Sequence, residues 1–182
     1  MRRNPCGVLR LTSVLAVVVV VACVHSASAD VTLASLFTDH MVLQRDMPLP
    51  VWGTADAGEQ VFVVVDGHVE ETTADDSGAW RLDLPPMGAG GPHTLVAEAS
   101  NRIELTDVLV GDVWVGSGQS NMQWTVSNSD DAEAEIAAAN YPNIRLLSVP
   151  RTVAGTPQDA VDATWVACSP ASIPSFSAVA YY

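Results

Sequence analysis

The sequence contains no lysine, and its eight basic residues are all arginine, set against 21 aspartate and glutamate residues. The resulting formal charge of −13 repels phosphate backbones and anionic headgroups, so we expect no nucleic-acid partner and no docking on anionic lipid. Internal repeats are absent as well, which excludes a solenoid or propeller. The 48% apolar content, with 12 glycines and 11 prolines, is typical of a folded, turn-rich protein rather than a disordered one.

Cysteine is scarce: Cys6 and Cys23 lie near the amino terminus, and Cys168 is the third. If the first 29 residues are removed, only the Cys168 thiol remains, which excludes an internal disulfide and a Cys-x-x-Cys redox or zinc site. We expect Cys168 to be a buried, unreactive thiol, because no base adjoins it in the sequence.

Long apolar runs are also missing, since the longest one, residues 14–24, is too short to cross a bilayer as a helix. It follows three arginines and precedes Ala27-Ser28-Ala29, an order that predicts a signal peptide over residues 1–29, cleaved after Ala29. The alternative is a lipoprotein signal with Cys23 as the lipidated residue. Cleavage after Ala29 predicts a secreted or periplasmic protein with no membrane contact. The remaining 153 residues carry a charge of 5 − 21 = −16.

Residues 30–107 consist of short apolar runs separated by turn residues. Asp66-Gly67 and the stretch Asp75-Asp76-Ser77-Gly78 are examples of such turns. No helical spacing occurs here, so the pattern predicts an antiparallel β-sandwich. The strands are expected at residues 41–43, 50–52, 61–65, 79–82 and 93–97, and Trp52 and Trp80 are expected to pack within them.

Residues 108–182 have a different pattern, typical of the start of an α/β domain. A mostly buried strand is expected at 108–115, with Trp114 packed in it, followed by a glycine-rich turn. A helix is expected at 130–139, with Asp130 and Glu133 as a capping box, and a second strand at 143–149. Ser175 is expected to cap a helix that starts at Phe176. The strand, helix, strand order predicts a parallel sheet.

Ser120 stands in the glycine-rich turn after that buried strand. A hydroxyl at the carboxyl edge of an α/β sheet is suitably placed to act as a nucleophile, and its backbone N–H to stabilise an oxyanion. The spacing alone favours an ordinary turn or N-cap serine.

The identities of the residues around Ser120 carry more information about function than their spacing does. The block at residues 111–122, which includes Gly118-Gln119-Ser120-Asn121-Met122, closely resembles the nucleophile block of sialate O-acetylesterase-like proteins, a branch of the SGNH (GDSL-like) hydrolases. Residues 36–45 and 50–53 resemble the amino-terminal β-domain of that family, and residues 141–145 and 176–181 resemble segments that follow its nucleophile. The resemblance extends, in the same order, over residues 31–182.

This resemblance implies a secreted serine carboxylesterase that removes O-acetyl groups from sugars such as sialic acid or acetylated plant polysaccharide, with no metal and no organic cofactor. Ser120 is implied to be the nucleophile and a backbone oxyanion donor. Gln119, Asn121 and Trp124 are candidates for binding the substrate.

The family's base is a histidine in a late Asp-x-x-His motif, and its other oxyanion donors also lie in later blocks; this sequence contains none of these. His40, His68 and His93 are expected to be solvated loop or strand-end residues. We therefore expect an amino-terminal β-sandwich followed by an incomplete, flavodoxin-like SGNH domain, as part of a longer esterase. Two alternatives stay open: a non-catalytic β-sandwich module for glycan binding or assembly, with an inert hydrolase remnant, and a secreted lipase-like esterase.

Overall fold

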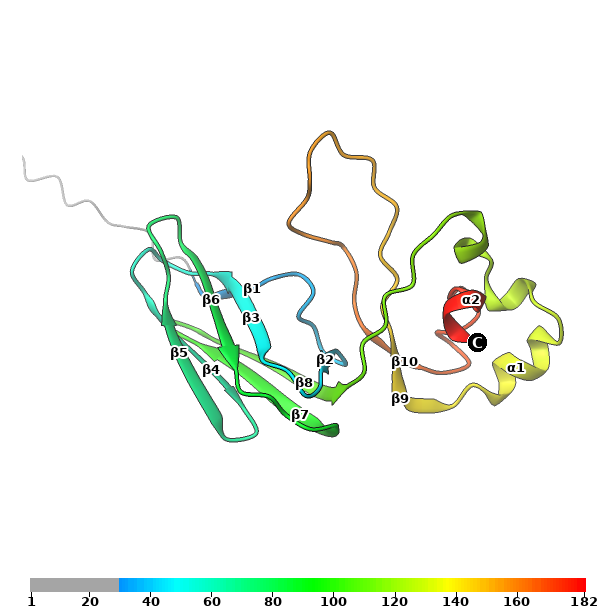
Figure 1. The fold of residues 1–182 in the computed structure, drawn as a ribbon, viewed down its shortest axis with the longest axis horizontal. Coiled ribbons are helices and arrows are strands. Elements are labelled where there is room, and N and C mark those ends of the chain that lie inside the picture. The colour runs from blue at the N-terminus through cyan, green and yellow to red at the C-terminus, as the bar shows by residue number, and fades with distance from the viewer. Residues whose placement is uncertain (1–29) are drawn as a thin grey trace, which may run out of the picture.

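The computed structural model describes residues 30–182, so the expected signal peptide and the alternative lipidation site lie outside the described residues. Two sheets form the amino-terminal half (Figure 1). The smaller sheet has the order β1-β3-β6 and the larger one β2-β8-β7-β4-β5. The bounds are β1 Thr32–Leu33, β2 Val42–Gln44, β3 Leu49–Thr54, β4 Gln60–Val65, β5 His68–Thr73, β6 Ala79–Leu84, β7 Gly90–Glu98 and β8 Arg102–Gly111.

The core of this β unit (residues 30–111) lies between the two sheets. Val61, Val63 and Val65 are alternate residues of β4 and are fully buried. Trp80 and Leu82 are alternate residues of β6, in the other sheet, and are also buried. All five belong to one apolar cluster. Successive side chains of a strand point to opposite faces of the sheet, so alternate residues point to the same face and meet in this core. The period-two pattern therefore predicts both the strands and their buried face.

Each of the five strands expected in residues 30–107 is present, as β2, β3, β4, β6 and β7. The Asp66-Gly67 turn joins β4 to β5 with positive φ at both residues, as a tight two-residue hairpin requires. The mixed, strand-rich fold class is thus confirmed. One pairing differs from the expected antiparallel pattern, because β2 runs parallel to β8.

The prediction of a strand at 108–115 is wrong in both the limits of the strand and the strands with which it pairs. β8 begins at Arg102, ends at Gly111, and pairs with β7 and β2 in the larger sheet of the β unit. Its apolar end, at Val108 and Val110, packs into the β-unit core. The expected division between residues 107 and 108 therefore lies inside one strand.

The carboxyl-terminal unit (residues 112–182) has its own small core. Its elements are η1 Ser120–Gln123, η2 Val126–Asn128, α1 Ala132–Ala138, β9 Tyr141–Leu146, β10 Val166–Cys168 and α2 Ala178–Tyr181 (Figure 1). The two strands pair antiparallel with each other in a two-stranded sheet, so the parallel sheet expected in residues 108–182 does not form there. No helix in this described part is long and apolar enough to cross a membrane.

Both expected helices are shorter than predicted and are capped differently. α1 begins after Asp131, which has a left-handed φ of 53° and makes no side-chain capping bond, so the capping box with Asp130 does not form. α2 is capped by Ser177 rather than Ser175, because the Ser177 hydroxyl accepts a hydrogen bond from the Ala180 N–H.

Candidate active site

Residues 112–118 lead from the end of β8 to Ser120 without regular secondary structure. The start of this segment is tied to the end of β2. The Val113 N–H donates to Gln44 Oε1 at 2.9 Å, and Arg45 Nε donates to Asp112 Oδ1 at the same distance. Since Gln44 and Arg45 follow one another in the β unit, the two bonds fix the direction in which the chain leaves that unit.

Ser120 is the first residue of η1, a single 3₁₀ turn. The Met122 N–H donates to the Gln119 carbonyl at 2.9 Å, and the Trp124 N–H donates to the Asn121 carbonyl at 3.1 Å. The Ser120 side chain is exposed, and within residues 30–182 neither its hydroxyl nor its backbone N–H makes a hydrogen bond. Both groups are consequently free to contact a ligand.

The turn packs closely against the segment that enters it. A Cβ at Gly118 would lie 2.8 Å from Met122 Cγ, and a Cβ at Gly116 would lie 2.9 Å from Met122 Cε and 3.3 Å from Ala180 Cβ. Glycine at these two positions lets the Met122 side chain lie against the backbone. This contact also brings η1 against α2.

A second set of backbone contacts supports the turn from the other side. The Ala178 N–H donates to the Trp124 carbonyl at 2.8 Å, and Thr125 forms an antiparallel bridge with Ser177. Ser177 and Ala178, at the start of α2 and far away in sequence, therefore hold the residues that follow η1.

The three residues expected to bind substrate lie close to Ser120 along the chain and are exposed. They are Gln119, Asn121 and Trp124, and the Trp124 indole N–H donates to the Asn128 carbonyl at 3.0 Å while 57% of the residue stays exposed. Their roles stay predictions. Trp114 is 90% exposed rather than packed in a strand, because β8 has ended three residues earlier.

Arg151 is a polar neighbour of this turn that the sequence pattern does not single out. It lies in the long loop that follows β9, and its Nη1 donates to Gln123 Oε1 at 2.9 Å. The contact joins residues 28 positions apart through a loop without regular structure, so no periodicity or motif could have found it.

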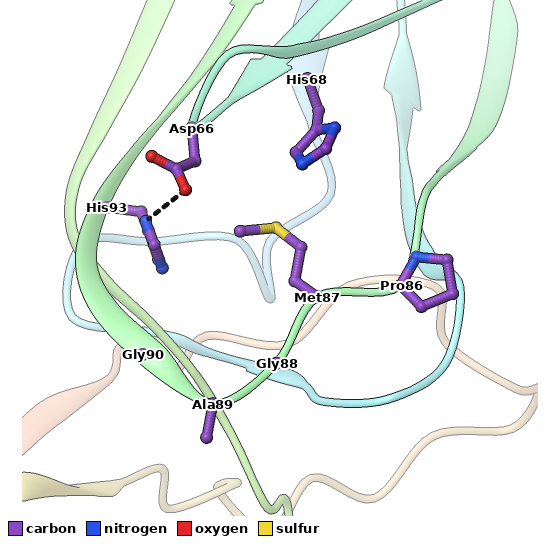
Figure 2. A pocket seen from close by; sticks show the side chains of 8 residues that line it. All are labelled: Asp66, His68, Pro86, Met87, Gly88, Ala89, Gly90 and His93. Carbon is purple, nitrogen blue, oxygen red and sulfur yellow. Dashed lines mark ion pairs between the residues drawn. The ribbon is translucent and has the colours of Figure 1, made fainter.

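The three histidines do not supply a base for Ser120. His40 Nδ1 lies 2.6 Å from Asp107 Oδ2, and His68 and His93 line an open pocket of about 380 Å³ in the β unit (Figure 2). None of them shares a hydrogen bond with Ser120.

His93 differs from the expected solvated residue. Its side chain is only 15% exposed, its Nδ1 lies 3.9 Å from Asp66 Oδ2, and its Nε2 is buried without a hydrogen-bond partner in the described residues (Figure 2). The pairing of β7 with β8 is irregular on both sides of His93, and the His93 side chain lines the pocket. Within residues 30–182, no group of three or more His, Cys, Asp or Glu residues is arranged to hold a metal ion.

The β unit and the carboxyl-terminal unit meet at a cluster formed by Arg145, Asp107 and His40. The Arg145 side chain, on β9, is 4% exposed and donates to both Asp107 carboxylate oxygens, at 2.8 and 2.9 Å. It also donates to the backbone carbonyls of His40 and Asp107. Hydrogen bonds from Arg145 and His40 lower the pKa of Asp107 to about 2, so its carboxylate stays ionised at neutral pH.

Two titratable side chains of the carboxyl-terminal unit, Cys168 and Tyr181, have structural contacts. Cys168 is 1% exposed, as expected, and burial raises the pKa of its thiol, which keeps it protonated. The Tyr181 hydroxyl donates to Glu135 Oε1 at 2.7 Å, and burial together with this carboxylate raises the pKa of the tyrosine. This bond joins α2 to α1.

Known proteins are similar to this chain in sequence and in fold. The chain is 34% identical over 157 residues to the sialate O-acetylesterase of Rattus norvegicus, which covers 78% of this chain and 29% of that protein. It is 36% identical over 138 residues to the human sialate O-acetylesterase, covering 69% of this chain and 26% of the relative. A solved carbohydrate acetylesterase from Xanthomonas citri matches with a TM-score of 0.82 and 38% identity, over 84% of this chain and 36% of the other.

The chain belongs to the sialate O-acetylesterase-like family. No protein-family model matches its sequence. It spans less than a third of the length of these curated family members, and about a third of the solved acetylesterase.

Proposed function

We propose that this family member supplies the nucleophile of a carbohydrate O-acetylesterase, and that Ser120 is that nucleophile. The observation that carries the proposal is the exposed, unbonded Ser120 at the first residue of η1, in a chain related to proteins named as acetylesterases of sialate and of carbohydrate.

The chemistry assigned to Ser120 follows from its two free groups. Its Oγ attacks the acetyl carbonyl while a base takes the hydroxyl proton, and the backbone N–H stabilises the oxyanion of the tetrahedral intermediate. The sugar hydroxyl leaves with a proton, and water then releases acetate from the acetylated serine. No step of this route requires a metal or an organic cofactor.

The base is the part of the mechanism that residues 30–182 do not provide. His40 bonds to Asp107, His93 is buried beside Asp66, and His68 lies in the same β-unit pocket. Without a base the serine hydroxyl stays protonated and reacts slowly. We therefore infer that residues 30–182 expressed alone give no steady turnover, and that the family's Asp-x-x-His histidine acts as the base in the complete polypeptide.

The test is acetate release by the product of the complete reading frame that contains this chain. We expect release from O-acetylated sugars and from 4-nitrophenyl acetate. Failure of the folded protein to hydrolyse any of these esters contradicts the proposal, as does steady turnover by residues 30–182 alone that Ser120→Ala abolishes.

We also propose that the protein is exported. The support is the order of charged, apolar and small residues in positions 1–29. Expression of the complete reading frame should yield a protein whose amino terminus is Asp30, as read by terminal sequencing of the periplasmic or medium fraction. A terminus at a lipidated Cys23 supports the lipoprotein alternative, and an intact Met1 in the cytoplasm contradicts export.

A further inference from the structure

Arg151 differs from the other arginines in its electrostatic environment. Residues 30–182 contain five arginines and 21 acidic residues. Each of the other four arginines has a carboxylate within 4 Å: the pairs are Arg45–Asp112, Arg81–Asp83, Arg102–Glu104 and Arg145–Asp107. Arg151 alone among these five has no carboxylate partner in the described residues, although acidic side chains outnumber arginines about four to one there.

The Arg151 side chain is bonded to η1, the turn that begins at Ser120. Its Nη1 donates to Gln123 Oε1 at 2.9 Å, and Gln123 ends the 3₁₀ turn that Ser120 begins. A 3₁₀ helix has three residues per turn, so side chains at positions i and i+3 lie on the same side. Arg151 therefore contacts η1 through the residue whose position in the turn matches that of Ser120.

The contact leaves most of the guanidinium available. Gln123 is a neutral anchor, so it orients Arg151 without cancelling its charge. Arginine carries five N–H donors, and the one bond to Gln123 is the single hydrogen bond of this side chain in residues 30–182. The side chain is exposed, and its planar donors match the two oxygens of a carboxylate.

We propose that Arg151 is a specificity-determining residue that binds the carboxylate of an acidic O-acetylated sugar while Ser120 attacks the acetyl group. This inference rests on the proposed function. The sugar is a sialic acid or a uronic acid, which present the same carboxylate. The net negative charge of the protein does not prevent this contact, because charges beyond about 8 Å are largely screened at physiological ionic strength.

The experiment compares Arg151→Gln with wild type in the product of the complete reading frame. Its substrates are O-acetylated N-acetylneuraminic acid, O-acetylated oligogalacturonate, neutral acetylated xylo-oligosaccharide and 4-nitrophenyl acetate. A hydrogen bond to a charged group contributes about 1.5–3 kcal/mol, so we expect kcat/KM on the acidic substrate to fall about 10- to 150-fold, mainly through KM. Both neutral substrates should change less than twofold.

Two further variants sharpen the comparison. Arg151→Lys keeps the charge but loses the paired donors, so it should restore only part of the kcat/KM on the acidic substrate. Arg102→Gln removes an arginine of the β unit that pairs with Glu104, and it should leave all four rates unchanged. A loss confined to the sialic or to the uronic substrate supports the inference and identifies the source of the carboxylate.

Other results overturn the inference. Equal losses on acidic and neutral substrates with a lower melting temperature assign Arg151 a structural role, and unchanged rates show that it contacts no substrate. Saturation-transfer NMR with free N-acetylneuraminate and galacturonate gives a readout independent of catalysis. If the protein hydrolyses no ester but binds one of these acids only when Arg151 is present, the proposed function is wrong and the anion site is supported. If binding of the acids does not depend on Arg151, the anion site is wrong.

Discussion

Replacing Ser120 with alanine should abolish ester hydrolysis by the product of the complete reading frame. The substitution removes the attacking oxygen and leaves only substrate binding and oxyanion contacts. Loss of the nucleophile in serine hydrolases costs about 10⁴- to 10⁶-fold in kcat, and we expect a loss in this range on 4-nitrophenyl acetate. The Ser120 side chain is exposed and makes no hydrogen bond in residues 30–182, so the melting temperature should not change.

Ser117→Ala is the matched control. Ser117 lies three residues earlier in the same glycine-rich segment, is exposed, and has no side-chain hydrogen bond in the described part of the chain. It should retain wild-type rates. If Ser120→Ala keeps more than a tenth of the activity, another residue is the nucleophile.

The second large effect is expected at the contact between the two units. Asp107→Asn removes the charge that faces Arg145, whose side chain is only 4% exposed. Breaking a buried ion pair costs about 3–5 kcal/mol, but 36% of the Asp107 side chain is exposed, so we expect about 2 kcal/mol from urea unfolding. Asp107 has a φ of 56°, which asparagine adopts readily, so backbone strain contributes little to the change.

Asp46→Asn is the control for this prediction. Asp46 also has a positive φ, of 61°, but its side chain is 66% exposed and lies 3.5 Å from Arg45. It should cost less than about 0.5 kcal/mol, as exposed ion pairs do. Equal losses in the two variants contradict a special role for the Arg145–Asp107 pair.

Asp107 also predicts how stability depends on pH. Its folded pKa, about 2, lies below the ordinary value for aspartate, because Arg145 and His40 bond to the carboxylate. The stabilisation is therefore complete above pH of about 4 and is lost as the pH falls toward 2. After allowance for the exposure of Asp107, this loss should be about 1 kcal/mol, and Asp107→Asn should show a smaller loss over the same range.

The strands of the β unit are predictable where one face is buried and the other is not. Val61 to Val65 and Trp80 to Leu84 show this alternation, and both segments form the expected strands. β5 was missed because none of its six side chains is buried, so the segment carries no apolar signal. The first half of β8 was missed for a related reason, since burial begins only at Val108.

The carboxyl-terminal unit was predicted less well, because the pairing of its strands depends on contacts between residues far apart in sequence. β9 and β10 are separated by a long loop and pair antiparallel, so the strand, helix, strand order was misleading. Ser120 was predicted as the nucleophile from the residues of a motif rather than from periodicity. The contact between Arg151 and Gln123 has no local signal of any kind.

The most direct test of the central claim is to identify the residue that reacts with a fluorophosphonate probe. The product of the complete reading frame is labelled, digested with trypsin, and examined by mass spectrometry. The peptide between the cleavage sites at Arg102 and Arg145 contains Ser120. We expect a phosphonate adduct on Ser120 that is absent from Ser120→Ala and present in Ser117→Ala. An adduct on a different residue, in a protein that hydrolyses acetyl esters, contradicts the assignment.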